Sequence, residues 1–201
     1  MVRRRWAEEG GEEHSRWYIE RFRRMAAEGA DLGGEARFMD ALLPPKSRIL
    51  DAGCGTGRVA AVLHDRGHKV VGVDADPLLI EAARADHPGP VFIVADLAEL
   101  DLAESGLELP FAGAVMAGNV MPFLAPGTEV AALSAIARHI EPHGAIVVGF
   151  GLDRGYDLDV FDSHLAEAGL VLEQRFATWD LRPWTTTSEF NVSVLRVPDQ
   201  I

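Results

Sequence analysis

The stretch Leu50-Asp51-Ala52-Gly53-Cys54-Gly55-Thr56-Gly57-Arg58 decides how this chain folds. It begins at the end of a short apolar run that is typical of a buried strand, and a helical pattern follows it over residues 58–65. Three glycines at alternate positions let the backbone turn sharply and approach a ligand, because glycine has no Cβ. The N-terminus of the next helix offers N–H groups and a positive dipole end. The sequence therefore predicts a ligand-holding turn, with a plain tight turn as the alternative.

The spacing of these glycines separates two classes of ligand. Dinucleotide-binding loops follow the pattern G-x-G-x-x-G, but here Gly57 comes one residue early and Arg58 takes the place that the third glycine would need. Asp51 lies two residues before Gly53. A carboxylate there would accept from an ammonium group and would add unfavourable charge near a pyrophosphate. The turn thus favours a ligand with a zwitterionic amino-acid end.

Strand-like runs and helical patterns alternate along the rest of the chain. Strands are expected over residues 48–51, 69–74, 91–96, 111–117, 145–150, 171–179 and 189–197. Helices are expected over residues 12–27, 35–43, 58–65, 76–86, 128–140 and 157–168. Between the last two strands there is no room for a helix, so they must form a hairpin and the final strand must be antiparallel.

These elements predict an α/β fold, with a doubly wound, mostly parallel, seven-stranded sheet, an antiparallel last strand and an N-terminal helical cap. We expect one domain over residues 1–201, with the cap at 1–45, a cofactor-binding core at 46–150, and a helix plus the terminal hairpin at 151–201. In such sheets ligands bind beyond the carboxyl ends of the strands, where the strand order reverses.

Two further acids stand at predicted strand ends. Asp74 ends the second strand, where a carboxylate can accept from both hydroxyls of a ribose. Asp96 ends the third strand, where it can accept from an exocyclic amine such as adenine N6, with Leu97 beside the ring. A helix N-cap or turn role is the alternative for each acid. Because Asp51, Asp74 and Asp96 fall on the same edge of the sheet, a shared ligand explains them better.

The runs LDAGCGTGR, VVGVDADP and VADLAEL resemble the cofactor signature of the small, stand-alone bacterial members of the class I S-adenosylmethionine-dependent methyltransferases. The resemblance covers roughly residues 48–150, and it implies S-adenosylmethionine as cofactor and S-adenosylhomocysteine as product. It implies that Asp51, Gly53, Cys54 and Gly55 hold the methionine end. It further implies that Asp74 and Ala75 contact the ribose and adenine, that Asp96 and Leu97 contact adenine, and that Ala117, Gly118 and Asn119 line the floor beside the sulfonium.

Composition narrows the class of partner. The 201 residues carry a formal net charge of −12, which disfavours sequence-independent binding to nucleic acid. The single cysteine excludes an intrachain disulfide and fits a reducing compartment. Neither a secretory signal nor an 18-residue apolar run is visible. We expect a cytoplasmic monomer or homodimer that acts on a small molecule, away from membranes and nucleic acid.

The acceptor side carries weaker signals. The segment Ala117-Gly118-Asn119-Val120-Met121-Pro122-Phe123 departs from the Asn/Asp-Pro-Pro-aromatic motif of enzymes that methylate amino groups of nucleic-acid bases and proteins. We expect three segments to reach over the cofactor: the N-terminal helix, the loop after the fifth strand and the hairpin tip. Their candidate substrate residues are Tyr18, Phe22, Arg154, Tyr156, Trp179, Arg182 and Trp184. An aromatic plug that packs on the sheet is the alternative for the hairpin tip.

No dedicated catalytic motif is required, since the donor methyl is activated by its own positive charge and the protein must mainly align the reactants. His14, Tyr18 and Asn119 are candidates for a catalytic role. The histidines show no metal-ligand spacing, so no metal site is expected. Two other functions stay open: a non-catalytic module that binds S-adenosylmethionine, and a nicotinamide-dependent reductase, which the glycine spacing and Asp51 disfavour.

Overall fold

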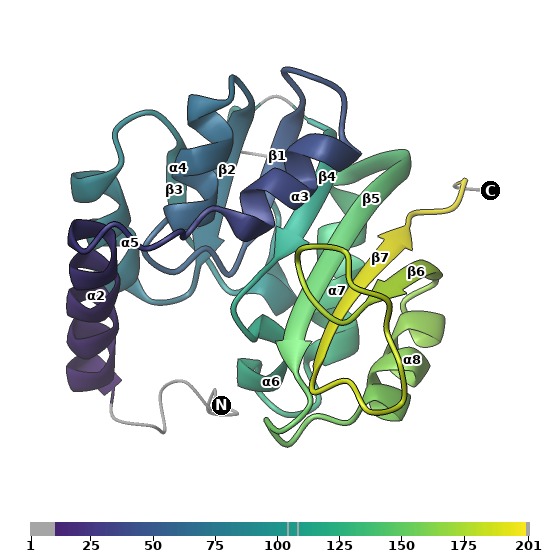
Figure 1. Cartoon of the computed structure of the whole chain (residues 1–201). Helices are drawn as coiled ribbons and strands as arrows, with labels where there is room; N and C mark the ends of the chain where they lie inside the picture. Colours follow the sequence, from purple (N-terminus) through teal and green to yellow (C-terminus); the bar gives the residue numbers. More distant parts are fainter. Residues whose placement is uncertain (1–10, 104, 108, 200–201) are drawn as a thin grey trace.

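The computed structural model describes residues 11–103, 105–107 and 109–199. Its centre is a seven-stranded sheet in the order β3-β2-β1-β4-β5-β7-β6 (Figure 1). The strands are β1 (Arg48–Ala52), β2 (Lys69–Asp74), β3 (Val91–Val94), β4 (Phe111–Met116), β5 (Ile140–Gly151), β6 (Val171–Phe176) and β7 (Phe190–Arg196). Strands β1 to β5 pair in parallel, and β7 is antiparallel to both β5 and β6. The predicted fold class is therefore confirmed, including the reversed last strand.

Helices cover both faces of this sheet. They are α2 (Gly11–Ala27), α3 (Gly34–Leu42), α4 (Arg58–Asp65), α5 (Pro77–Asp86), η1 (Leu97–Glu99), α6 (Val120–Phe123), α7 (Glu129–Arg138) and α8 (Leu158–Glu167). One apolar cluster joins α3, α4 and α5 to the sheet, and a second joins α7 and α8 to the opposite face. The strand order reverses between β1 and β4, so the expected ligand position is the carboxyl edge between these two strands.

Several boundaries differ from the expected ones for local reasons. Strand β3 ends at Val94 because Asp96 caps the short helix η1, with its Oδ1 accepting from the Ala98 N–H at 3.0 Å. Strand β6 ends at Phe176, where a bridge to Pro183 turns the chain back. Strand β5 begins at residue 140 rather than 145, because the chain pairs with β4 before the irregularity that precedes residue 145.

The N-terminal helix α2 stands at the β3 side of the molecule and docks on α5 (Figure 1). Arg23 of α2 forms a two-point ion pair with Asp86 of α5, at 2.8 and 3.0 Å. Nearer the N-terminus of α2, the Ser15 hydroxyl donates to the Asp76 carboxylate. These two contacts hold α2 across the carboxyl edge of the sheet. Within the described part of the chain, no helix is long and apolar enough to cross a membrane.

Candidate functional site

The glycine turn has a backbone that its composition requires. Gly53, Gly55 and Gly57 have φ values of +80°, +55° and +77°, in the region that favours glycine. A Cβ at Gly53 would lie only 2.4 Å from the Val120 side chain. The N–H groups of Gly53 and Cys54 both donate to the Val73 carbonyl oxygen, at 2.7 and 3.0 Å. The turn after β1 is thereby fixed to the end of β2.

Asp74 ties this turn to the next one. Its Oδ2 accepts from the Gly55 N–H and its Oδ1 accepts from the Asp76 N–H, both at 2.9 Å. Asp76 in turn caps α5, because its Oδ1 accepts from the Leu78 N–H at 2.8 Å. One carboxylate therefore sets the spacing of the two turns that follow β1 and β2.

A cavity of about 340 Å³ lies at this edge of the sheet. Helix α2 contributes Gly11, Glu12, Ser15 and Tyr18 to its wall. The segments after β1 and β2 contribute Gly53, Gly55, Asp74, Ala75, Asp76, Pro77, Leu78 and Leu79. The segments after β3 and β4 contribute Asp96, Leu97, Ala117, Gly118, Val120, Phe123 and Leu124. This volume is within the range of ordinary small-molecule sites.

Most residues predicted to hold the cofactor meet in this cavity. They are Gly53, Gly55, Asp74, Ala75, Asp96, Leu97, Ala117 and Gly118. The other three predicted residues, Asp51, Cys54 and Asn119, do not line it. Carboxylates, bare glycine backbone and apolar side chains therefore gather around one space, although they come from four separate strand ends.

Asp51 lies behind the turn. It is 1% exposed, and its Oδ2 accepts from the Ala60 N–H of α4 at 3.0 Å. Burial raises the pKa of this carboxyl to about 7, while the nearby Arg58 guanidinium acts in the opposite direction. In this structure Asp51 thus binds the first turn of α4 and does not line the cavity.

Cys54 and Asn119 also turn away from the cavity. The Cys54 side chain packs in the core between the sheet and α4, where burial raises the pKa of its thiol. Asn119 has a φ of +67°, and its Oδ1 accepts from the Gly151 N–H at 2.7 Å. This bond ties the segment after β4 to the end of β5. Asn119 therefore shapes the floor through its backbone position, and its side-chain oxygen is used within the protein.

Tyr18 of α2 covers the glycine turn. A Cβ at Gly55 would lie 3.4 Å from the Tyr18 ring, and one at Gly118 would lie 3.9 Å from its hydroxyl. Burial raises the pKa of this phenol to about 12, against an opposing effect of Arg58. The phenol is thus protonated at neutral pH and can donate a hydrogen bond.

Arg58, the last residue of the glycine stretch, joins three helices. Its guanidinium donates to the Leu32 carbonyl oxygen at 3.0 Å and forms a partly buried ion pair with Glu35 of α3. It also lies over the Phe22 ring of α2, 5.4 Å from the ring centroid. Phe22 packs against Tyr18 at 4.6 Å between centroids. Phe22 therefore supports Tyr18 from behind and does not line the cavity itself.

The other candidates for acceptor binding are dispersed. Tyr156 is 6% exposed, packs on Phe150 and Phe161, and shares a hydrogen bond with His164 of α8 at 2.7 Å. It belongs to the core and does not line the cavity. Arg154 is exposed at the carboxyl edge, beside Asp153. His14 lies on the Trp17 ring, outside the cavity wall.

The connection between β6 and β7 packs on the sheet through its aromatic residues, which is the alternative that the sequence left open for the hairpin tip. Trp179 packs on Phe38 of α3, and a Cβ at Gly149 of β5 would lie 2.3 Å from its ring. Trp184 lies against the Arg175 guanidinium at 5.8 Å. Arg182 is exposed and pairs with Asp180 at 3.3 Å. None of the three tip residues predicted to bind substrate lines the cavity.

Sequence reasoning missed part of the wall. Ser15 lies three residues before Tyr18 on one helical face, a spacing that a joint role could have suggested. Asp76, which caps α5, also bounds the cavity. Phe123 and Leu124 come from a four-residue helix that is too short to show a periodic pattern. Among the described residues, no group of three His, Cys, Asp or Glu side chains could hold a metal ion.

Comparisons with known proteins agree on one chemistry. The family model described as "Methyltransferase domain" matches residues 49–144. A crystal structure of a TehB-like SAM-dependent methyltransferase from Corynebacterium glutamicum is 43% identical, covers 91% of this chain and 97% of its own, and superimposes with a TM-score of 0.85.

Two curated relatives are similar over shorter stretches. An uncharacterized methyltransferase of Bacillus subtilis, YodH, is 33% identical over 140 residues, or 65% of this chain and 56% of that protein. A trans-aconitate 2-methyltransferase of Escherichia coli is 40% identical over 68 residues, or 33% of this chain and 27% of that enzyme. The chain therefore spans 56% and 27% of the length of these two relatives.

Proposed function

The chain belongs to the S-adenosylmethionine-dependent methyltransferases, and from that premise we propose that it methylates a small organic acceptor by in-line displacement. The acceptor's lone pair would form the new bond to the methyl carbon as the carbon–sulfur bond breaks, with its electron pair passing to sulfur. S-adenosylmethionine, when bound, supplies a methyl group that its sulfonium charge has already activated. What this chain supplies is alignment of the two reactants, which can account for much of a rate enhancement.

The residues of the cavity suit this cofactor. Asp74 is placed for the ribose, because a carboxylate can accept about four hydrogen bonds and can hold the glycine turn and ligand hydroxyls together. We assign Asp96 to the exocyclic amine of adenine, and the apolar side chains of Leu97 and Phe123 line the same cavity. The space between Tyr18 and the turn depends on Gly55 and Gly118 having no side chain.

The observation that carries the proposal is the convergence of this wall. In our assignment Gly53 and Gly55 hold the methionine end, Asp74 and Ala75 the ribose and adenine, and Asp96 and Leu97 the adenine edge. Ala117 and Gly118 form the floor beside the methyl group, opposite Tyr18. Asp51, Cys54 and Asn119 support the same wall from behind through the hydrogen bonds and packing described above.

A small acceptor is favoured by three features. The formal charge of −12 opposes nucleic acid. The segment after β4 lacks the motif of base and protein amino-methylating enzymes, and α2 covers the cavity edge. One curated relative is named for trans-aconitate, which is a small molecule.

Titration calorimetry with S-adenosylmethionine and with a nicotinamide dinucleotide tests the donor half of the proposal. Binding of the first and not the second is expected, and the opposite result would overturn the assignment of the cavity. Incubation with fractionated metabolite extracts, read out as S-adenosylhomocysteine release, tests the acceptor half. Release with macromolecular fractions alone would refute a small acceptor.

A further inference from the structure

Helix α2 carries a stack of cationic and aromatic side chains beside Tyr18. The Arg21 guanidinium lies over the Trp17 ring, 5.4 Å from its centroid, and near the Phe22 ring at 5.8 Å. On the other side, Trp17 contacts the His14 ring at 5.5 Å between centroids. Trp17 is nonetheless 51% exposed. A large aromatic side chain with half its surface in solvent offers a flat apolar platform next to a cation.

The charge of Arg21 is not neutralised by any acid of the described part of the chain. Among the described residues, no carboxylate lies within ion-pair distance of its guanidinium. The acids around the cavity differ. Asp74 and Asp96 accept from backbone N–H groups, and Glu12 lies 3.5 Å from Arg16. In this acidic protein the uncompensated charge of the α2 stack is therefore positive.

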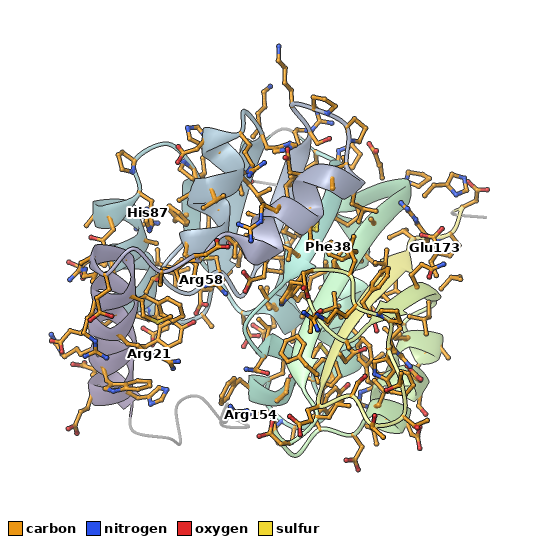
Figure 2. All side chains as sticks on the ribbon, in the orientation of Figure 1. Arg21, Phe38, Arg58, His87, Arg154 and Glu173 are labelled. Atoms are coloured by element: carbon orange, nitrogen blue, oxygen red, sulfur yellow. The ribbon has the colours of Figure 1, made fainter. Side chains whose placement is uncertain are left out.

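Arg21 lies near the place where methyl transfer is proposed. It follows Tyr18 by three residues, so the two side chains are neighbours on the helix surface. Its charge is also among those that act on the Tyr18 phenol. Figure 2 shows Arg21 on the sheet-facing side of α2. Arg21 and Trp17 do not line the cavity themselves, but Tyr18 does and lies over Gly55 and Gly118, so a molecule held by Arg21 would approach the proposed methyl position past Tyr18.

A second arginine stands at the carboxyl edge. Arg154 follows β5, and its side chain passes Gly151, where a Cβ would lie 3.5 Å from the Arg154 Cγ and 3.6 Å from the Asn119 Oδ1. Its ion pair with Asp153 is 3.4 Å long, with side chains 53% and 79% exposed, so a ligand anion could replace it at little cost. Figure 2 shows Arg154 at the lower edge of the sheet, where β5 ends.

We propose that the acceptor is a flat organic carboxylate, whose anionic group pairs with Arg21 while its unsaturated or aromatic part packs on Trp17. Arg154, beside the Asn119 side chain at the end of β5, would add positive charge on the sheet side of the entrance. The inference rests on the proposed function, because it assumes that the acceptor enters beside Tyr18. It adds a class of substrate: an acid is preferred over the corresponding amide or amine.

Three matched probes test this preference on the full chain loaded with S-adenosylhomocysteine: trans-cinnamate, cinnamamide and cinnamylamine. We expect cinnamate to bind about tenfold more tightly than the other two, as one charge-assisted pair would give. Arg21→Gln should remove the preference, Arg21→Lys should keep part of it, and Trp17→Ala should weaken cinnamate and cinnamamide alike. Arg24→Gln is the matched control, because it removes the same charge from the same helix three residues farther along.

Equal binding of acid, amide and amine would overturn the proposal, as would an equal loss in Arg21→Gln and Arg24→Gln. The dissociation constant for S-adenosylhomocysteine, measured in each variant, separates this failure from failure of the proposed function. If the product binds and cinnamate shows no preference, only the acceptor class is wrong. If neither S-adenosylmethionine nor its product binds, the assignment of the cavity itself is wrong.

Discussion

At the scale of single residues, Asp74 has the most concentrated role, since one carboxylate holds two turns and faces the cavity. Asp74→Asn would place an amide N–H₂ against backbone donors. We expect the dissociation constant for S-adenosylmethionine to rise about 10- to 100-fold, the range for a lost bond to a charged group. Calorimetry measures it. Asp101→Asn is the control, because Asp101 accepts a similar N–H bond from Ala103 outside the cavity. Equal affinities in both variants would contradict this role.

The buried carboxyl of Asp51 predicts a pH dependence of stability. Its pKa is raised from 3.8 to about 7, mainly by burial. Because the folded state favours the protonated carboxyl, Asp51 makes its full contribution to the free energy of unfolding below about pH 4. That contribution is lost as the pH rises to about 7. Per pH unit the loss is on the order of 1 kcal/mol. Urea unfolding of the wild type and Asp51→Asn should therefore show the wild type losing stability relative to the variant between pH 5 and pH 7. If the free energies of unfolding of the two proteins changed in parallel with pH, this role of Asp51 would be refuted.

Single residues also show what the sequence could and could not predict. Gly53, Gly55, Asp74 and Asp96 were identified because their backbone freedom or charge is visible in the residue type itself. Whether a neighbouring side chain faces the cavity depends on the turn's dihedral angles, which the motif does not state. Cys54 and Asn119 are the examples: the sequence placed each at the end of the correct strand, but packing holds the Cys54 side chain in the core and a hydrogen bond from Gly151 holds that of Asn119.

At the scale of elements, α2 forms the outer wall of the cavity and is held by few contacts. Its exposed ion pair to Asp86 contributes about 0.2–1 kcal/mol. Its amides should therefore exchange with solvent faster than those of β1 or β4, and S-adenosylhomocysteine should slow that exchange. Hydrogen exchange read by mass spectrometry on residues 11–27 checks this, and Arg23→Ala should accelerate exchange further. Exchange that the ligand does not change would contradict a covering role for α2.

The connection between β6 and β7 crosses the α3 face of the sheet, as Figure 1 shows in yellow. Because Trp179 packs on Phe38 and against Gly149 there, Trp179→Ala should lower the free energy of unfolding by about 2–4 kcal/mol. Affinity for S-adenosylmethionine should stay unchanged. Chemical unfolding and calorimetry on one preparation measure both. A stable variant with impaired acceptor kinetics would restore the acceptor role that the sequence suggested.

Element by element, the alternation of helical and strand-like patterns predicted α2, α4 and all seven strands, although α2 buries only Ser15 and β6 buries no residue. The same patterns could not place α2 against α5. That arrangement depends on Arg23 and Asp86, which are 63 residues apart and unremarkable in sequence. Nor could composition distinguish an acceptor pocket from a plug at Trp179, since both uses favour large aromatic side chains.

At the scale of the whole molecule, the cavity joins the N-terminal helix to four strand ends, so ligand binding and global folding are coupled. With S-adenosylhomocysteine at 100 times its dissociation constant, the free energy of unfolding should rise by about 2.7 kcal/mol. Urea unfolding with and without ligand measures this. A nicotinamide dinucleotide serves as the negative control, and equal stabilisation by both would reopen the reductase interpretation.

The thiol of Cys54 has a practical consequence at this scale. It is the only thiol in the chain, it is 7% exposed, and burial keeps its pKa well above the ordinary value. An alkylating reagent can therefore reach a thiolate only when the glycine turn leaves its native position. The rate of Cys54 alkylation thus reports the rate at which the glycine turn opens. Mass spectrometry can follow it as a single mass increment, without any introduced label.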